Sequence, residues 1–183
     1  MQHLLDLVGA IVIGGLIMLL LIGYNANLVQ TSSTMGFTLR EQENLSAATE
    51  VLEFDFRKMG YRVADSIKVT LADTARITFR TDLDNNGALD SIRYYLGSVP
   101  SRASGNRQVR TLYRVVNNRT PYPVHTGIRQ FRLWYLDRLG NFTTVRQNIR
   151  AVRVLVNSEG NASADGRYTG ISWDRVIRPK NLR

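Results

Sequence analysis

The residues best suited to chemistry lie in segment 82–90, which reads Asp-Leu-Asp-Asn-Asn-Gly-Ala-Leu-Asp. Oxygen-bearing side chains alternate along it and Gly87 allows a tight bend, as in the first nine positions of a calcium-binding loop. The twelfth position, where a bidentate glutamate is expected, holds Arg93. The pattern predicts a weak Ca²⁺ site completed by water or by ligands from elsewhere. The alternative is a polar hairpin loop in which Asp and Asn satisfy the backbone. The predicted ligands are Asp82, Asp84, Asn86, the Ala88 carbonyl and Asp90.

Arginine dominates the charge of the chain. There are 24 Lys and Arg residues against 15 acids, a formal net charge of +9, and the only lysines are Lys58, Lys68 and Lys180. A planar guanidinium makes paired bonds to carboxylate or phosphate and stacks on aromatic rings. Arginines near Phe131 and Trp134 could therefore bind single-stranded nucleic acid. Cross-strand ion pairs and subunit contacts are the competing uses. The residues of this predicted anionic-partner face are Arg110, Arg114, Arg129, Arg132, Arg150 and Arg153.

The sequence gives little support to catalysis. The chain has no cysteine, which removes thiol nucleophiles, thiolate metal sites and disulfides together. Its two histidines are His3, beside an apolar segment, and His125, in a proline-rich stretch with no obvious partner. No nucleophile elbow or phosphate-binding loop is present. We predict that the protein is not an enzyme.

The rest of the chain continues from the apolar stretch 4–23, which would position it relative to a membrane. As a helix it spans about 30 Å, the thickness of a bilayer core. Asp6 is the exception, because a carboxylate in lipid is costly unless it finds a partner. No Lys or Arg precedes Arg40, so the stretch is unlike a secretory signal. We predict a retained, single-pass membrane helix in residues 1–24.

The pattern then predicts that the helix continues as an amphipathic segment through residues 25–60. A bend or break is expected near Thr31–Thr34, and Gly60 is a typical helix stop. The apolar positions recur at steps of three or four, which places them on one face. They are Met35, Leu39, Leu45, Ala48, Leu52, Phe56 and Met59.

From Tyr61 the period changes from that of a helix to that of a strand. Residues 117–127 are expected to be irregular. The pattern predicts an α+β fold: one long helix packed on an antiparallel sheet of about six strands that fills residues 61–183. The predicted strands are 67–71, 75–79, 91–96, 109–116, 128–136 and 149–156, with a further strand at 168–177.

The order of these elements resembles the type IV pilin superfamily, within it the minor pilins and minor pseudopilins. Family members begin with Phe-Thr-Leu-Ile-Glu-Leu, and Gln2–Leu7 places Asp6 where that glutamate falls. Segment 52–61, Leu-Glu-Phe-Asp-Phe-Arg-Lys-Met-Gly-Tyr, is similar to the helix end of the larger minor subunits. The family's basic leader ending in glycine is not evident before Gln2. We expect either a chain written from its mature start or one that escapes processing.

The resemblance implies a minor or tip subunit of a type IV pilus or type II secretion-type filament, with its C-terminal domain outside the cytoplasm. Its partners would be the lipid bilayer and other pilin-like subunits, bound through the N-terminal helix. Asp6 would meet the N-terminal amine of a neighbouring subunit, which offsets its burial. Two alternatives remain: a single-pass anchored binding domain that does not polymerise, and a DNA-uptake pilin that uses the arginine face.

Overall fold

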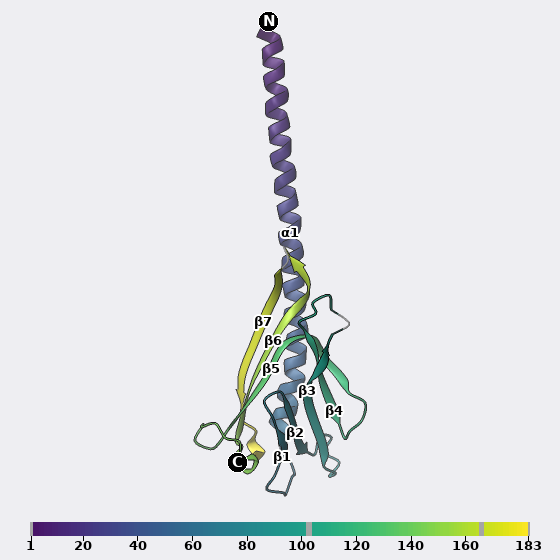
Figure 1. Cartoon of the computed structure of the whole chain (residues 1–183), viewed down its shortest axis with the longest axis vertical. Coiled ribbons are helices and arrows are strands. Elements are labelled where there is room, and N and C mark those ends of the chain that lie inside the picture. The colour runs from purple at the N-terminus through teal and green to yellow at the C-terminus, as the bar shows by residue number, and fades with distance from the viewer. Residues whose placement is uncertain (1, 102–103, 165–166, 183) are drawn as a thin grey trace. The chain divides into compact units, whose positions relative to one another are not determined.

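The computed structural model describes residues 2–101, 104–164 and 167–182, and its chain divides into two compact units, Met1–Leu39 and Arg40–Arg183. Helix α1, Gln2–Lys58, supplies the described part of the first unit and begins the second (Figure 1). The described residues of the first unit contain no other element.

Helix α1 does not break at the Thr31–Thr34 segment or at Gly36. The Thr34 and Thr38 hydroxyls each donate to the carbonyl four residues earlier, on Gln30 and Thr34, at 2.9 Å. Both hydroxyls thus find an acceptor within the helix itself.

The second unit is the α+β fold that the sequence predicts. Its sheet has seven antiparallel strands in the order β1-β2-β3-β4-β5-β6-β7, so each strand pairs with its neighbours in sequence. The strand count is seven rather than about six, because the expected tail strand is a full member of the sheet. The strands are β1 Val69–Ala72, β2 Arg76–Thr81, β3 Asp90–Pro100, β4 Arg110–Val116, β5 Tyr122–Leu136, β6 Ala151–Ala164 and β7 Arg167–Ile177. Short 3₁₀ helices occur at Arg146–Asn148 and Lys180–Leu182.

The expectation of irregular structure over residues 117–127 is wrong for its second half. Strand β5 begins at Tyr122 and pairs with β4 despite Pro123, which lies opposite Tyr113. The pairing contains register shifts on both sides of Leu112. Such bulges let a strand accommodate a proline, which cannot donate to the ladder.

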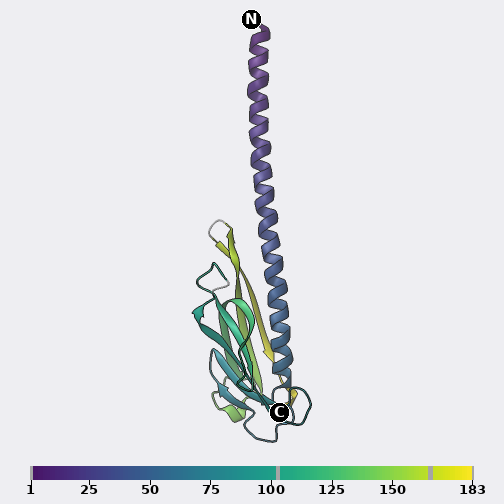
Figure 2. The same ribbon diagram turned by 90° about the vertical axis from the view of Figure 1, so that its right-hand side faces the viewer.

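Residues 40–58 of α1 cover one face of this sheet (Figure 2). Leu52 and Phe56 are fully buried there, as is Met59 directly after the helix. Phe56 meets the rings of Phe79 and Tyr94 edge to face at 5.6 Å each. The predicted apolar stripe holds from Leu45 onward. Its first two members do not join the core, since Met35 and Leu39 are 62% and 59% exposed.

Gly60 ends the helical segment as predicted. Its φ of +78° lies in the left-handed region, which a glycine adopts without strain. A Cβ at this position would lie 2.7 Å from Cδ of Lys68. The Gly60 amide donates to the Arg80 carbonyl at 2.9 Å, so the turn leads directly to the first hairpin, β1–β2.

A buried ion pair fixes α1 against the middle of the sheet. Asp55, 1% exposed, accepts two hydrogen bonds from the guanidinium of Arg114 on β4 and one from the Tyr94 hydroxyl on β3 at 2.7 Å. Burial, together with the nearby Asp55 charge, raises the pKa of Tyr94 well above its ordinary value, so the hydroxyl remains a donor. Every oxygen of this buried carboxylate is therefore satisfied.

Replacement of Arg114 by methionine should destabilise the fold strongly, because it leaves Asp55 buried without its counter-charge. We expect a loss of about 3–5 kcal/mol in the free energy of unfolding. Urea denaturation of the full chain in a non-ionic detergent measures it.

The matched control is Arg153→Met, which removes an exposed ion pair with Asp174. Exposed pairs contribute about 0.2–1 kcal/mol, so this variant should unfold close to the wild type. Equal losses in the two variants would contradict the role assigned to the buried pair.

Candidate functional site

A long run of exposed apolar side chains lies on the first unit. The described hydrophobic side chains of α1 from Leu7 to Leu39 bury little against their own chain, and many are more than half exposed. The helix contains one stretch long and apolar enough to cross a membrane, and none of that stretch is buried inside the protein. A surface of this kind binds lipid tails or other apolar helices.

Asp6 lies exposed on this unit, one helical turn after Gln2. The favourable field of a helix N-terminus acts mainly within the first turn, so it gives Asp6 limited help. A carboxylate on an apolar helix therefore needs water, a headgroup or a cationic partner from another molecule. The structure places Asp6 where such a partner could reach it.

The acidic segment 82–90 lies between β2 and β3, next to the end of α1. One carboxylate oxygen from each of Asp82, Asp84 and Asp90 lies within 4.8 Å of the other two. The side chain of Asn86, a further predicted ligand, is engaged within the loop: its oxygen accepts the Ala88 amide at 2.7 Å, and its amide group donates to Asp84. The structure thus brings the three predicted carboxylate ligands together.

Asp82 is the buried member of this group. Desolvation is the largest influence on its pKa and raises it, but the combined hydrogen bonds and charge outweigh that effect and hold the pKa below its ordinary value. These hydrogen bonds come from the guanidinium of Arg62, which also supplies the charge, and from backbone amides, including that of Gly87. Asp82 is therefore ionised at neutral pH.

The arginines predicted to form an anionic-partner face are not on one face. Arg114 points toward α1 and pairs with Asp55, whereas Arg132 and Arg153 flank the ring of Trp134 at 5.3 and 5.2 Å from its centroid.

The other predicted arginines have separate surroundings. Arg129 pairs with Glu159, and Arg153 also pairs with Asp174. Arg150 donates to the carbonyls of Gln147 and Ile149, and Arg110 is exposed at the start of β4. Binding of nucleic acid stays a prediction.

His125 is not the unpartnered loop residue that the sequence suggested. It lies buried on β5, where Nε2 is 3.3 Å from the Glu41 carboxylate and 3.5 Å from the Ser158 hydroxyl. Ser158 is fully buried on β6, and its hydroxyl also bonds to Glu41 of α1. Glu41 and Ser158 are separated by 117 residues and belong to no motif, so no local pattern could have identified this cluster.

The Glu41–His125–Ser158 cluster contains the residue types of a hydrolytic triad but not the geometry. In a triad one ring nitrogen accepts the serine proton while the other donates to the acid. Here Nδ1 of His125 accepts the Gly127 amide at 2.9 Å, which leaves Nε2 as the protonated nitrogen of the neutral ring. That nitrogen faces both Ser158 and Glu41, so it cannot take the serine proton. The cluster attaches α1 to β5 and β6.

Comparison of this chain with protein-family models, with curated proteins and with solved structures found no match.

The pH dependence of stability should report the bonds to Glu41. Hydrogen bonding from His125, followed by that from Ser158, lowers the pKa of Glu41 below its ordinary value of 4.5 against the opposing effect of burial. A depressed carboxyl pKa gives stability that is present above about pH 4.5 and is lost as the pH falls through the folded-state value.

Glu41→Gln should therefore unfold with a flatter pH profile than the wild type below about pH 4.5. Urea midpoints between pH 3 and pH 7 measure this, with Glu43→Gln, a neighbouring exposed position, as the control. Parallel profiles for Glu41→Gln and the wild type would show that these bonds contribute no pH-dependent stability.

Proposed function

We propose that this chain is a non-enzymatic, membrane-anchored subunit of a pilin-like filament, of the minor type that occurs in type IV pili and type II secretion systems. The observation that supports this most is the extent of the exposed apolar surface on α1. Residues 4–23 already give about 30 Å of helix, enough for one bilayer core. Exposed apolar side chains continue beyond it, at Leu28, Val29, Met35, Phe37 and Leu39.

A helix that only anchors a domain needs no apolar side chains past the bilayer. Residues 24–39 add about 24 Å of helix, and water is an unfavourable solvent for their apolar groups. Packing of these residues against the same segment of neighbouring subunits would remove them from water. Filament assembly through α1 accounts for the whole length of the exposed apolar surface, whereas a lipid anchor accounts for its first part.

The glycines of the first unit favour such packing. A Cβ added at Gly9, Gly14, Gly15 or Gly23 would meet no atom of the chain within 4 Å. Small residues on a membrane helix let a second helix backbone approach closely. In this arrangement Asp6 lies near the N-terminal amine of a neighbouring subunit, as the family resemblance implies, and the second unit is displayed on the extracytoplasmic side.

Cysteine cross-linking in native membranes tests the proposal. Because the chain has no cysteine, each introduced cysteine is the only one, and any disulfide-linked species reports contact with another molecule. We expect single cysteines through residues 24–39 to cross-link with a period near 3.6, the repeat of one helix face packed on another helix. Cysteines at exposed positions of the sheet should cross-link less and without that period.

The alternative is an anchored domain that binds a partner and does not polymerise. It predicts monomers at every cysteine position in segment 24–39. A uniform low level of cross-linking without helical period would also contradict assembly through a defined face.

Asp6 provides the sharpest single substitution. Asp6→Asn should insert into the membrane as well as the wild type, since it removes a charge that lipid disfavours. If the carboxylate pairs with an amine of a neighbouring subunit, the variant should lose incorporation into the sheared filament fraction at least about tenfold, which corresponds to about 1.4 kcal/mol.

Asp6→Glu is the matched control, because it keeps the charge at the same position. It should retain most of the incorporation. If Asp6→Asn is incorporated into the filament fraction as well as the wild type is, the role proposed for this carboxylate is contradicted.

A further inference from the structure

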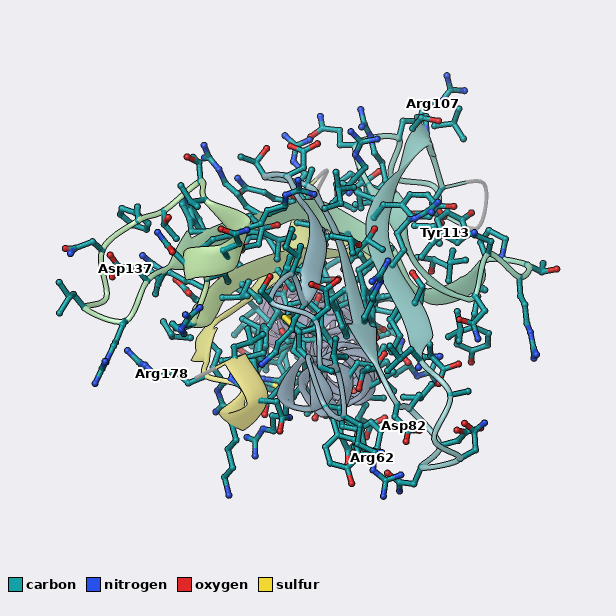
Figure 3. All side chains as sticks on the ribbon, turned by 90° about the horizontal axis from the view of Figure 1, so that it is seen from below. Arg62, Asp82, Arg107, Tyr113, Asp137 and Arg178 are labelled. Atoms are coloured by element: carbon teal, nitrogen blue, oxygen red, sulfur yellow. The ribbon has the colours of Figure 1, made fainter. Side chains whose placement is uncertain are left out.

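The loop between β2 and β3 contains a buried acceptor with no partner. Asp82 has a fully buried side chain, and its Oδ2 accepts Nη1 of Arg62 at 2.9 Å and the Gly87 amide at 3.1 Å. The other oxygen, Oδ1, is buried and has no hydrogen-bond partner among the described residues. Figure 3 shows Arg62 and Asp82 side by side at this end of the domain. Burial of a carboxylate oxygen without a partner costs free energy, and a bound ligand at this atom would remove that cost.

The remaining carboxylates of the loop leave coordination capacity free. Asp90 accepts the Leu83 amide and the Asn117 side-chain amide, and Asp84 accepts two bonds from Asn86. All of these donors are neutral, and a carboxylate has about four lone-pair sites. Within the described part of the chain, neither Asp84 nor Asp90 forms an ion pair.

The local charge favours a cation. Three carboxylates lie within 4.8 Å of one another, and Arg62 is the one guanidinium paired with any of them in the described residues. Arg93, which replaces the expected twelfth-position glutamate, is directed elsewhere: its guanidinium donates to Asn118 at 3.0 Å. It therefore does not neutralise the loop.

We propose that this loop binds one Ca²⁺ ion, with Asp82 Oδ1 and carboxylate oxygens of Asp84 and Asp90 as protein ligands and water completing the coordination. Calcium accepts six to eight oxygens in a flexible arrangement, whereas magnesium requires a near-ideal octahedron. Zinc is less favoured than calcium at this group, because structural zinc sites are built mainly from sulfur and nitrogen ligands and the group offers oxygen alone.

The ion would strengthen the junction where α1 meets the sheet. Lys58 donates from Nζ to the Leu83 carbonyl at 2.7 Å, and the Thr81 hydroxyl donates to the Lys58 carbonyl at 2.8 Å. The Asp82 amide donates to the Tyr61 carbonyl at 3.0 Å. A ligand that holds Asp82, Asp84 and Asp90 together thus also holds the end of the helix, independently of whether the chain forms filaments.

Calorimetric titration of the full chain, purified in a non-ionic detergent and stripped with EDTA, tests the site directly. We expect one Ca²⁺ per chain with a Kd of about 10⁻⁴–10⁻³ M, the range of sites with few charged ligands. Addition of 10 mM CaCl₂ should raise the Tm by about 3–8 °C, and 10 mM MgCl₂ should raise it less. The tryptophans Trp134 and Trp173 provide the unfolding signal.

Asp84→Asn is the main variant, because Asp84 lies on the surface side of the loop and its loss should not unfold the domain. It should weaken Ca²⁺ binding at least about tenfold, as expected for the loss of one charged ligand. Asp90→Asn should do the same. Asp174→Asn removes one acid from an exposed ion pair on β7 and should bind as the wild type does.

Three results would overturn the proposal. The first is the absence of saturable Ca²⁺ binding to the wild-type chain up to 10 mM. The second is equal stabilisation by Ca²⁺ and Mg²⁺, which indicates a general ionic effect. The third is unchanged affinity in both Asp84→Asn and Asp90→Asn, which would place the ion elsewhere.

Discussion

The domain depends on the burial of one helix face. Leu52, Phe56 and Met59 are 0% exposed, and they cover the strands that would otherwise present Ile77, Phe79 and Ile92 to water. Because every sheet connection joins neighbours in sequence, the sheet has no crossover helix to cover this face. The C-terminal segment of α1 therefore forms the second layer of the core, and the helix cannot leave without exposing it.

Polar contacts set where that helix face sits on the sheet. Glu41 meets His125 and Ser158 near the start of the helical segment 40–58. In its last turn, Asp55 meets Arg114 and Tyr94, and Lys58 meets Leu83. Apolar burial is non-directional, so a helix could slide by a turn at small cost if nothing else constrained it. A displaced helix would leave the Asp55 carboxylate buried without its partners. We infer that these contacts act mainly by selecting one register, because a buried ion pair adds little net stability over an apolar contact of the same shape.

The fold was accessible from the sequence because its signals are local. The change from helical to strand periodicity near Tyr61, the stop at Gly60 and the alternation in each strand need only a window of neighbouring residues. Periodicity marks an apolar face but not what covers it: Met35 and Leu39 belong to the same predicted stripe as Leu45, although the buried face begins only at Leu45. The functional clusters were less accessible for a related reason. Arg114 was counted with the surface arginines, and its contact with Asp55 joins residues 59 positions apart, which no spacing rule reports.

The acidic loop between β2 and β3 shows what a local sequence pattern can predict and what depends on contacts between distant residues. Its composition identified the oxygen ligands, but the feature that argues for an ion is the burial of Asp82 Oδ1, which depends on how Arg62 and Gly87 occupy the other oxygen. Arg62 adopts a φ of +56° and Asn85 one of +64°, and Nη1 of Arg62 also lies 3.3 Å from the Asn85 carbonyl. The same packing that fixes the end of α1 thus creates the buried acceptor, and a cation bound there would stabilise the junction through which the helix holds the sheet.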